Sequence, residues 1–136
     1  MTYRVVVERE DDWWLADVPQ SQGTHTEARD LIELEHMVRD VIALMEDLPF
    51  TPESLAAFEL EWVFETGDAE FDTLATRLAA ERSAVDVPDE RTRAVATDLG
   101  AHGWPVRDIA WLLGVSPRRV GRWVPRSARG VAGIAR

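Results

Sequence analysis

Apolar and polar residues alternate in three short segments near the start of the chain, the pattern of strands with one buried face. Tyr3–Glu8 and Trp13–Val18 are rich in β-branched and aromatic residues, and Pro19 follows the second segment. The acidic run 10–12 between them predicts a tight turn and an antiparallel hairpin. Thr24–Arg29 alternates more weakly and predicts a third, short strand.

The next segment has helical periodicity. Asp30 is expected to cap this helix, and Glu33 completes a capping-box-like pair three residues later. We expect the helix to run from Leu31 to about Leu48, with the two prolines that follow closing it. Its apolar stripe comprises Leu31, Leu34, Val38, Val41, Ile42, Met45 and Leu48.

Phe58–Glu65 has the clearest strand pattern in the chain, with four apolar side chains on one face and glutamates on the other. A sheet with one apolar face, covered by the preceding helix, is the simplest packing of these elements. The side of the strand that carries Trp62 is therefore expected in the core, with an apolar docking edge as the alternative.

Residues 67–88 are expected to be a connecting helix and linker. Gly67 breaks the strand, and Asp68 can cap a helix from Ala69 to about Ala84. One face of this helix carries Phe71, Leu74, Ala75 and Leu78. Asp89 can then cap another helix, from Glu90 to Leu99, which Gly100 and Gly103 are expected to end.

Residues Val106–Val124 resemble a helix-turn-helix. Gly114 stands where a left-handed cap would end the first helix, and Ser116 and Pro117 suit the start of the second. Ala110 is small where the two helices must approach closely. The shared core is expected to contain Ile109, Leu113, Val115, Val120 and Trp123.

The second of these helices would read DNA. Arginine can bond guanine edges bidentately or hold phosphates, and the helix N-terminus adds N–H donors for phosphate. The alternative is a small helical hairpin with a solvated basic face. The expected DNA-binding residues are Ser116, Arg118, Arg119, Arg122 and Arg126.

Charge is divided unevenly along the chain, whose net charge is −10 over 136 residues. Residues 1–90 hold 23 acidic residues and 6 arginines, whereas residues 91–136 hold 2 and 9, so the two parts carry −17 and +7. A phosphate backbone would attract the second part and repel the first. There is no cysteine, no signal-peptide pattern and no apolar run of the roughly 20 residues that span a bilayer, so we expect a cytoplasmic protein.

The first half resembles the HicB family of antitoxins. The resemblance rests on the order of an aromatic-led strand, an acidic turn, a second aromatic-led strand ending in Val18-Pro19, Gly23, a short strand, the Asp30-capped helix and a returning strand. It implies a small β-β-β-α-β domain related to a degraded RNase H fold, dimeric or higher, that binds a small basic HicA-like toxin RNase. It also implies autorepression of the operon through the C-terminal module.

The expected fold is thus α+β. It consists of the HicB-like domain in residues 1–66, the connecting segment 67–88, an all-α helix-turn-helix module in residues 89–125 and a flexible basic tail in residues 126–136.

We expect neither enzymatic activity nor a cofactor or metal. RNase H chemistry needs clustered carboxylates around Mg²⁺, and although Asp17 lies on a candidate strand, most acids fall at solvent-facing positions. His25, His36 and His102 lack metal-ligand spacing.

Three functions remain open from the sequence. The first is an antitoxin of a type II toxin-antitoxin pair that represses its own operon by binding operator DNA. The second is a solitary helix-turn-helix transcription regulator whose N-terminal domain dimerises or senses a ligand. The third is a residual nuclease. For a protein partner, the expected contacts are Asp11, Asp12, Trp13 and Trp14, unless one tryptophan is in the core and the acids are solvated.

Overall fold

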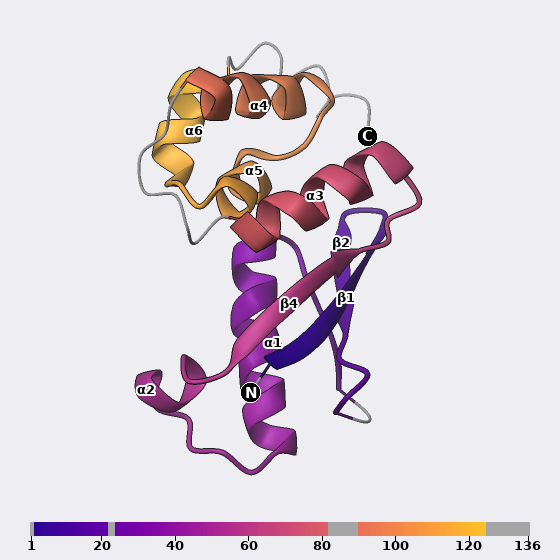
Figure 1. Cartoon of the computed structure of the whole chain (residues 1–136), viewed down its shortest axis with the longest axis vertical. Coiled ribbons are helices and arrows are strands. Elements are labelled where there is room, and N and C mark those ends of the chain that lie inside the picture. Colours follow the sequence, from indigo (N-terminus) through magenta and orange to yellow (C-terminus); the bar gives the residue numbers. More distant parts are fainter. Residues whose placement is uncertain (1, 22–23, 82–89, 125–136) are drawn as a thin grey trace. The chain divides into compact units, whose positions relative to one another are not determined.

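A computed structural model of the chain describes residues 2–21, 24–81 and 90–124, which fall into two compact units, Met1–Ala80 and Glu81–Arg136 (Figure 1). The first unit is α+β and the second is all α. The first contains β1 (Thr2–Glu10), β2 (Trp13–Asp17), β3 (His25–Ala28), α1 (Leu31–Met45), α2 (Pro52–Leu55), β4 (Glu59–Phe64) and α3 (Ala69–Glu81).

The first two strands form the predicted antiparallel hairpin. Glu10 pairs with Trp13, so the turn is made by Asp11 and Asp12 alone. Asp11 has φ 55°, a left-handed conformation that the short side chain of aspartate tolerates better than most. The acidic run therefore makes the turn, and its first residue extends β1.

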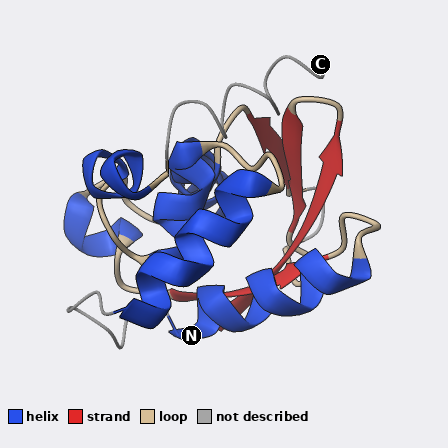
Figure 2. Ribbon diagram, turned by 90° about the horizontal axis from the view of Figure 1, so that it is seen from above, coloured by secondary structure: helices blue, strands red, loops and turns tan. Residues whose placement is uncertain are grey.

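The four strands make a single twisted sheet in the order β3-β2-β1-β4 (Figure 2). β1 and β2 are antiparallel, as are β2 and β3, whereas β4 returns parallel to β1 after the α1 crossover. Successive strand residues point to opposite faces, so the sheet has one apolar and one polar side. The apolar side carries Val5, Val7, Trp14, Ala16, Ala28, Trp62 and Phe64, all buried. The expectation that the Trp62 side belongs to the core is confirmed.

α1 packs against β2 and β3 and supplies the other half of this core. Asp30 caps it as predicted, because its carboxylate accepts a hydrogen bond from the Glu33 amide at 2.8 Å. Leu31, Leu34, Val38 and Ile42 are fully buried. The predicted stripe is therefore correct over its first three turns.

The end of α1 was predicted wrongly. The helix stops at Met45 because Asp47 takes a left-handed conformation, with φ 57°. The Leu48 amide then donates to the Ala43 carbonyl at 2.7 Å and the Asp47 amide to Leu44 at 3.4 Å, which is a Schellman motif. Met45 is consequently 48% exposed rather than part of the buried stripe.

α2 is a single helical turn that the sequence analysis missed. The Thr51 hydroxyl caps it by accepting from the Ser54 amide at 3.1 Å. The guanidinium of Arg39 in α1 holds the segment after it, since Nη1 donates to the carbonyls of Leu55 and Phe58 at 2.9 and 3.0 Å.

α3 packs within the first unit, where we had expected a connecting helix. Asp68 caps it as predicted, accepting from the Phe71 amide at 3.1 Å. Phe71 lies in the aromatic core, with its ring centroid 6.0 Å from Phe64. The hydroxyl of Thr76 accepts a hydrogen bond from the Phe64 amide at 3.0 Å, which ties α3 to β4. The expected end of this helix at Ala84, the expected linker 85–88 and the expected cap Asp89 lie outside the described residues, as does Gly23.

Across the described ranges, no helix is both long and apolar enough to cross a membrane.

Candidate nucleic-acid interface

The described part of the second unit, residues 90–124, is a bundle of three helices, α4 (Glu90–Ala101), α5 (Val106–Leu113) and α6 (Pro117–Trp123), each of which packs on the other two. Its core is small and almost wholly apolar. It consists of Ala96, Leu99, Ile109, Ala110, Trp111, Leu112, Leu113, Val120 and Val124, together with the buried Asp108.

Gly100 was expected to end the first of these helices, and this prediction is wrong. α4 continues to Ala101, and Gly100 lies inside it where α6 comes closest. A Cβ at residue 100 would stand 2.4 Å from Cγ1 of Val124, so no larger residue fits there without displacement. Gly103, the other glycine expected to end the helix, does so with φ 97°, because the Trp104 amide then reaches the Leu99 carbonyl at 3.1 Å.

The predicted turn between the last two helices is confirmed. Gly114 has φ 71° and ψ 29°, which a residue without Cβ adopts at no steric cost. The Val115 amide donates to the Ala110 carbonyl at 3.1 Å across this cap. The Ser116 hydroxyl then accepts from the Arg119 amide at 3.2 Å, and Pro117 occupies the first turn of α6.

Two of the expected core residues, Val115 and Trp123, are only half-buried, and at Trp123 the core position is shifted by one residue. Val120 is fully buried as predicted, but Trp123 is only half-buried, and Val124 is fully buried in its place. α6 ends at Trp123, and Val124 has an extended backbone, with φ −102° and ψ 110°. The prediction for Trp123 assumed that the helix continues beyond this residue. Because it ends there, the side chain of Val124 packs against Gly100 in the core.

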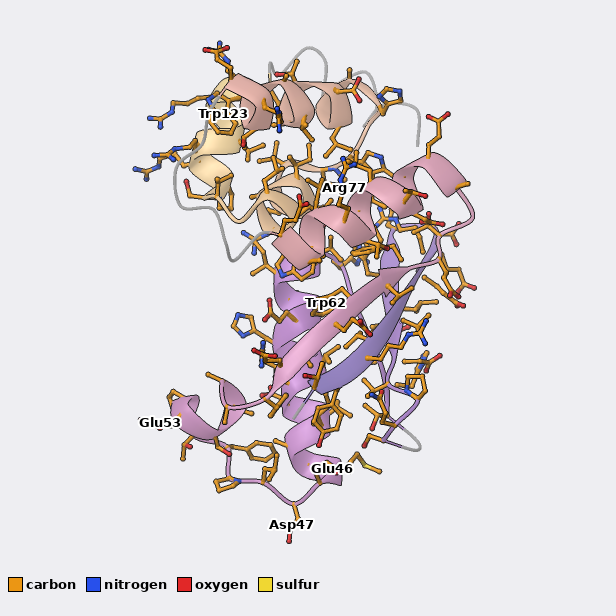
Figure 3. The ribbon with its side chains drawn as sticks, viewed as in Figure 1. Glu46, Asp47, Glu53, Trp62, Arg77 and Trp123 are labelled. Carbon is orange, nitrogen blue, oxygen red and sulfur yellow. The ribbon has the colours of Figure 1, made fainter. Side chains whose placement is uncertain are left out.

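The outer side of α6 is basic. Arg118 and Arg122 are exposed and four residues apart, which places them on one helix face, and Arg119 is half-buried beside them. Within the described part of the chain, none of the three guanidinium groups forms an ion pair with a carboxylate. Figure 3 shows nitrogen-tipped side chains projecting from this helix. Arg126, the fifth expected contact, lies outside the described residues.

Three further exposed arginines were not singled out from the sequence. Arg91 and Arg93 lie on α4, and Arg107 lies in the first turn of α5. Residues 90–124 hold six arginines against three acids, one of which, Asp108, is only 1% exposed. The charge count of the C-terminal segment was the signal that could have found them.

The expected protein contacts on the hairpin separate into two groups. Asp11, Asp12 and Trp13 are exposed at its tip, and the Arg29 guanidinium lies 4.5 Å from the Trp13 ring centroid. Trp14 points to the opposite side of the strand and is fully buried, 5.9 Å from the Phe64 ring. The assignment of Trp14 to a partner surface is therefore wrong.

The acidic residues that the structure describes do not gather into a metal site. Among residues 2–21, 24–81 and 90–124, no group of three or more His, Asp or Glu side chains is arranged to hold an ion. Asp17, the candidate carboxylate for a nuclease, lies 2.9 Å from His25 on the exposed face, and both side chains are more than half exposed.

Comparison with known proteins identifies one region. Residues 87–135 match the family model described as a homeodomain-like domain, which spans α4, α5 and α6. The match supports the helix-turn-helix expected in this region and is consistent with a DNA-binding regulator. No match supports the HicB resemblance of the first half. No curated protein and no solved structure matches the chain.

Proposed function

We propose that the protein is a transcription regulator that binds operator DNA as a homodimer, with α6 in the major groove. One observation carries this proposal. In a homeodomain-like module the last helix reads DNA, and here that helix is α6. Ser116 caps it and Gly114 makes the turn before it. Its exposed side carries arginines that form no ion pair with a carboxylate among the described residues.

The position of each arginine in the module determines which part of the DNA it would contact. Arg118 and Arg122 share the exposed face of α6 and would reach base edges, where an arginine–guanine pair discriminates by about 1–3 kcal/mol. Arg119, Ser116 and Arg126 would hold the phosphate backbone. Arg107, at the start of α5, lies on the helix that crosses the backbone in modules of this kind.

Two copies are needed because one such module contacts few bases. A homodimer would read two half-sites about one helical turn, roughly 10 base pairs, apart, and the operator would then be palindromic. We expect the N-terminal unit to hold the copies together.

The test is binding of fluorescent duplex DNA from upstream of the gene, followed by anisotropy at several salt concentrations. Arg122→Ala should weaken binding by about 5- to 150-fold and relax the preference for guanine at one position of the half-site, because a base contact is lost. Arg77→Ala is the matched control, since Arg77 is also exposed but lies on α3 of the first unit (Figure 3). Equal affinities of the two variants, or a wild-type affinity that does not change with salt, would refute the proposal.

We further propose that the first unit is a degraded RNase H-like domain that neutralises a small basic toxin RNase, so that the protein is an antitoxin that represses its own operon. Two observations support this. The unit has the expected β-β-β-α-β order, and residues 1–80 hold 19 acidic residues against 5 arginines. The polar side of the sheet carries exposed Glu8, Asp17, Glu27, Glu59 and Glu61. Such a surface complements the basic surface on which an RNase holds RNA.

The test of this second proposal is co-expression with a small basic protein encoded beside the gene. A complex should survive purification at low salt, and Asp11→Asn with Asp12→Asn should slow its formation, because charges at an interface mainly set the association rate. If no complex forms and the small protein alone leaves growth unaffected, the protein is a solitary regulator.

A cavity in the first unit favours the alternative of a solitary regulator that senses a ligand. An open cavity of about 310 Å³ at one end of the first unit is lined by Tyr3, Glu46, Leu48, Ser54, Ala57 and Phe58. Its volume is at the lower end of the range for small-molecule sites, so it is the place where a ligand would be sensed.

A further inference from the structure

The exposed large apolar residues that the structure describes in the first unit are concentrated on α1 and the loop that follows it. Among the described residues, five large apolar side chains are exposed, and four of them lie on α1 or in the loop after it. Met37, Leu44, Met45 and Phe50 are 36, 66, 48 and 60% exposed, respectively. We refer to these four residues as the α1 apolar face.

This surface continues the helix's buried side. Met37, Val41 and Leu44 are spaced i, i+4 and i+7, so they form a second stripe beside the buried Leu34 and Val38. Val41, between the other two, is half-buried. A helix that only covered its own sheet would carry polar residues at these positions, so α1 has the pattern of a helix that packs on two sides.

The area is sufficient for a stable contact. If a large apolar side chain offers on the order of 200 Å², the four exposed fractions amount to about 400 Å² of apolar surface. A standard interface buries about 800 Å² on each partner, a little over half of it apolar. The α1 apolar face thus supplies nearly all the apolar area that one side of such an interface needs.

We propose that the α1 apolar face is the surface through which two copies of this chain pair. The proposal rests on the proposed function in one respect, namely that a dimer delivers two DNA-binding modules. A two-fold axis near Val41 would run the two α1 helices antiparallel, with Met37 of one copy toward Leu44 and Met45 of the other. The same residues then serve both sides, as a two-fold interface requires.

The edge of β4 is a second surface at which two copies could pair, but it is less suited to such pairing. Its last amide, that of Phe64, donates to Thr76 of α3, and the neighbouring positions carry exposed Glu59, Glu61 and Glu65. Charged side chains on an edge strand oppose pairing with another strand.

Acidic residues border the α1 apolar face. Asp40, Glu46, Asp47 and Glu53 are all exposed, and Figure 3 places the last three at the end of the unit where α1 stops. In a two-fold pair about Val41, Asp40 lies near the axis and faces its own copy, and the other three carboxylates add to the negative charge that each copy carries around the interface. The repulsion is screened by salt, so the dimer should tighten as salt rises, whereas DNA binding weakens.

The experiment is sedimentation velocity of the full chain without DNA at about 0.1 and 0.5 M salt, a range over which the Debye length falls severalfold. Leu44→Glu should raise the dimer dissociation constant by roughly 100-fold or more, because the change occurs twice in the interface. Trp13→Glu is the matched control, since Trp13 is the fifth exposed large residue but lies on the hairpin, and it should leave the dimer unchanged. Circular dichroism of both variants checks that they are folded.

A folded Leu44→Glu protein that dimerises like the wild type would overturn the inference, as would a wild-type chain that stays monomeric at every salt concentration. Dimerisation that weakens with salt would also count against the acid-bordered interface. A monomeric wild-type chain would also remove the homodimer from the proposed function, whereas DNA binding through α6 is tested separately by the affinity difference between Arg122→Ala and Arg77→Ala.

Discussion

Replacing Gly100 with alanine should destabilise the helix-turn-helix module even though alanine is the better helix former. Gly100 lies within α4, and the added methyl carbon would stand 2.4 Å from Cγ1 and 3.1 Å from Cγ2 of Val124. Val124 cannot easily move aside. Its side chain is fully buried and β-branched, and its amide is bonded to the Val120 carbonyl at 2.9 Å.

Helix propensity and overpacking have opposite effects on the stability of the Gly100→Ala variant. Alanine in place of glycine inside a helix contributes about 0.5–1 kcal/mol of stability. Overpacking by one methyl group in a close-packed core costs about 1–3 kcal/mol. We therefore expect a net loss of roughly 0.5–2 kcal/mol in the free energy of unfolding of the second unit.

Two companion variants isolate the cause. Val124→Ala alone should cost about 1.6 kcal/mol or more, since two buried methyl groups are removed. Combined with Gly100→Ala, it should cost less than the sum by about 1 kcal/mol or more, because the new methyl group fills the vacated space. Gly121→Ala is the control in α6, where a Cβ meets nothing within 4 Å, and it should stabilise by about 0.5–1 kcal/mol.

Amide hydrogen exchange in the full chain is the appropriate assay, because it measures the opening of α4, α5 and α6 separately from that of the first unit. If Gly100→Ala protects these amides as well as Gly121→Ala does, the close approach of α4 to Val124 is not a constraint. Strict additivity of the Gly100 and Val124 changes would refute the steric argument in the same way.

Two further predictions concern the first unit. Because only Trp14 is in the core, Trp14→Ala should destabilise this unit by about 3–5 kcal/mol and Trp13→Ala by less than about 1 kcal/mol. Urea unfolding followed by circular dichroism measures both losses. Equal losses would contradict the placement of Trp14 in the core and Trp13 on the surface. Burial, and then the charge and hydrogen bond of Glu46, raise the pKa of Tyr3, which is the chain's one tyrosine. The midpoint of tyrosinate absorbance should therefore lie above the ordinary pKa of about 10. In Glu46→Gln this midpoint should move to lower pH. Since the unfolded chain ionises first, stability should fall as pH rises through this window, and less so in Tyr3→Phe; an ordinary midpoint would refute this.

The parts of the fold that follow local rules could be predicted from the sequence. The hairpin follows from alternation on both sides of an acidic turn, and the starts of α1, α3 and α6 follow from capping residues three positions before the amides they bind. The cap at Gly114 follows in the same way from the need for a left-handed residue. Each of these depends on neighbours within a few positions of the chain.

The wrong predictions concern positions whose structure depends on residues far away in the sequence. Gly100 resembles a helix terminator until Val124, 24 positions along the chain, is known to pack against it. Periodicity places Trp123 inside only if α6 continues, and the side of β2 that the core occupies cannot be decided from two adjacent tryptophans. The interface on DNA, the homodimer and the protein partner depend on molecules beyond the single chain and stay predictions.

The hydrogen bond from Phe64 to Thr76 has a consequence for how such a chain can be recombined. A cut made directly after β4 would remove the Phe71 ring from the aromatic core and leave a strand-edge amide without its acceptor. The smallest transferable piece of the first unit therefore extends through Glu81, the end of α3. Gene fusions that exchange the DNA-binding module for another, in the laboratory or in evolution, should be tolerated at junctions after this helix and rejected at junctions before it.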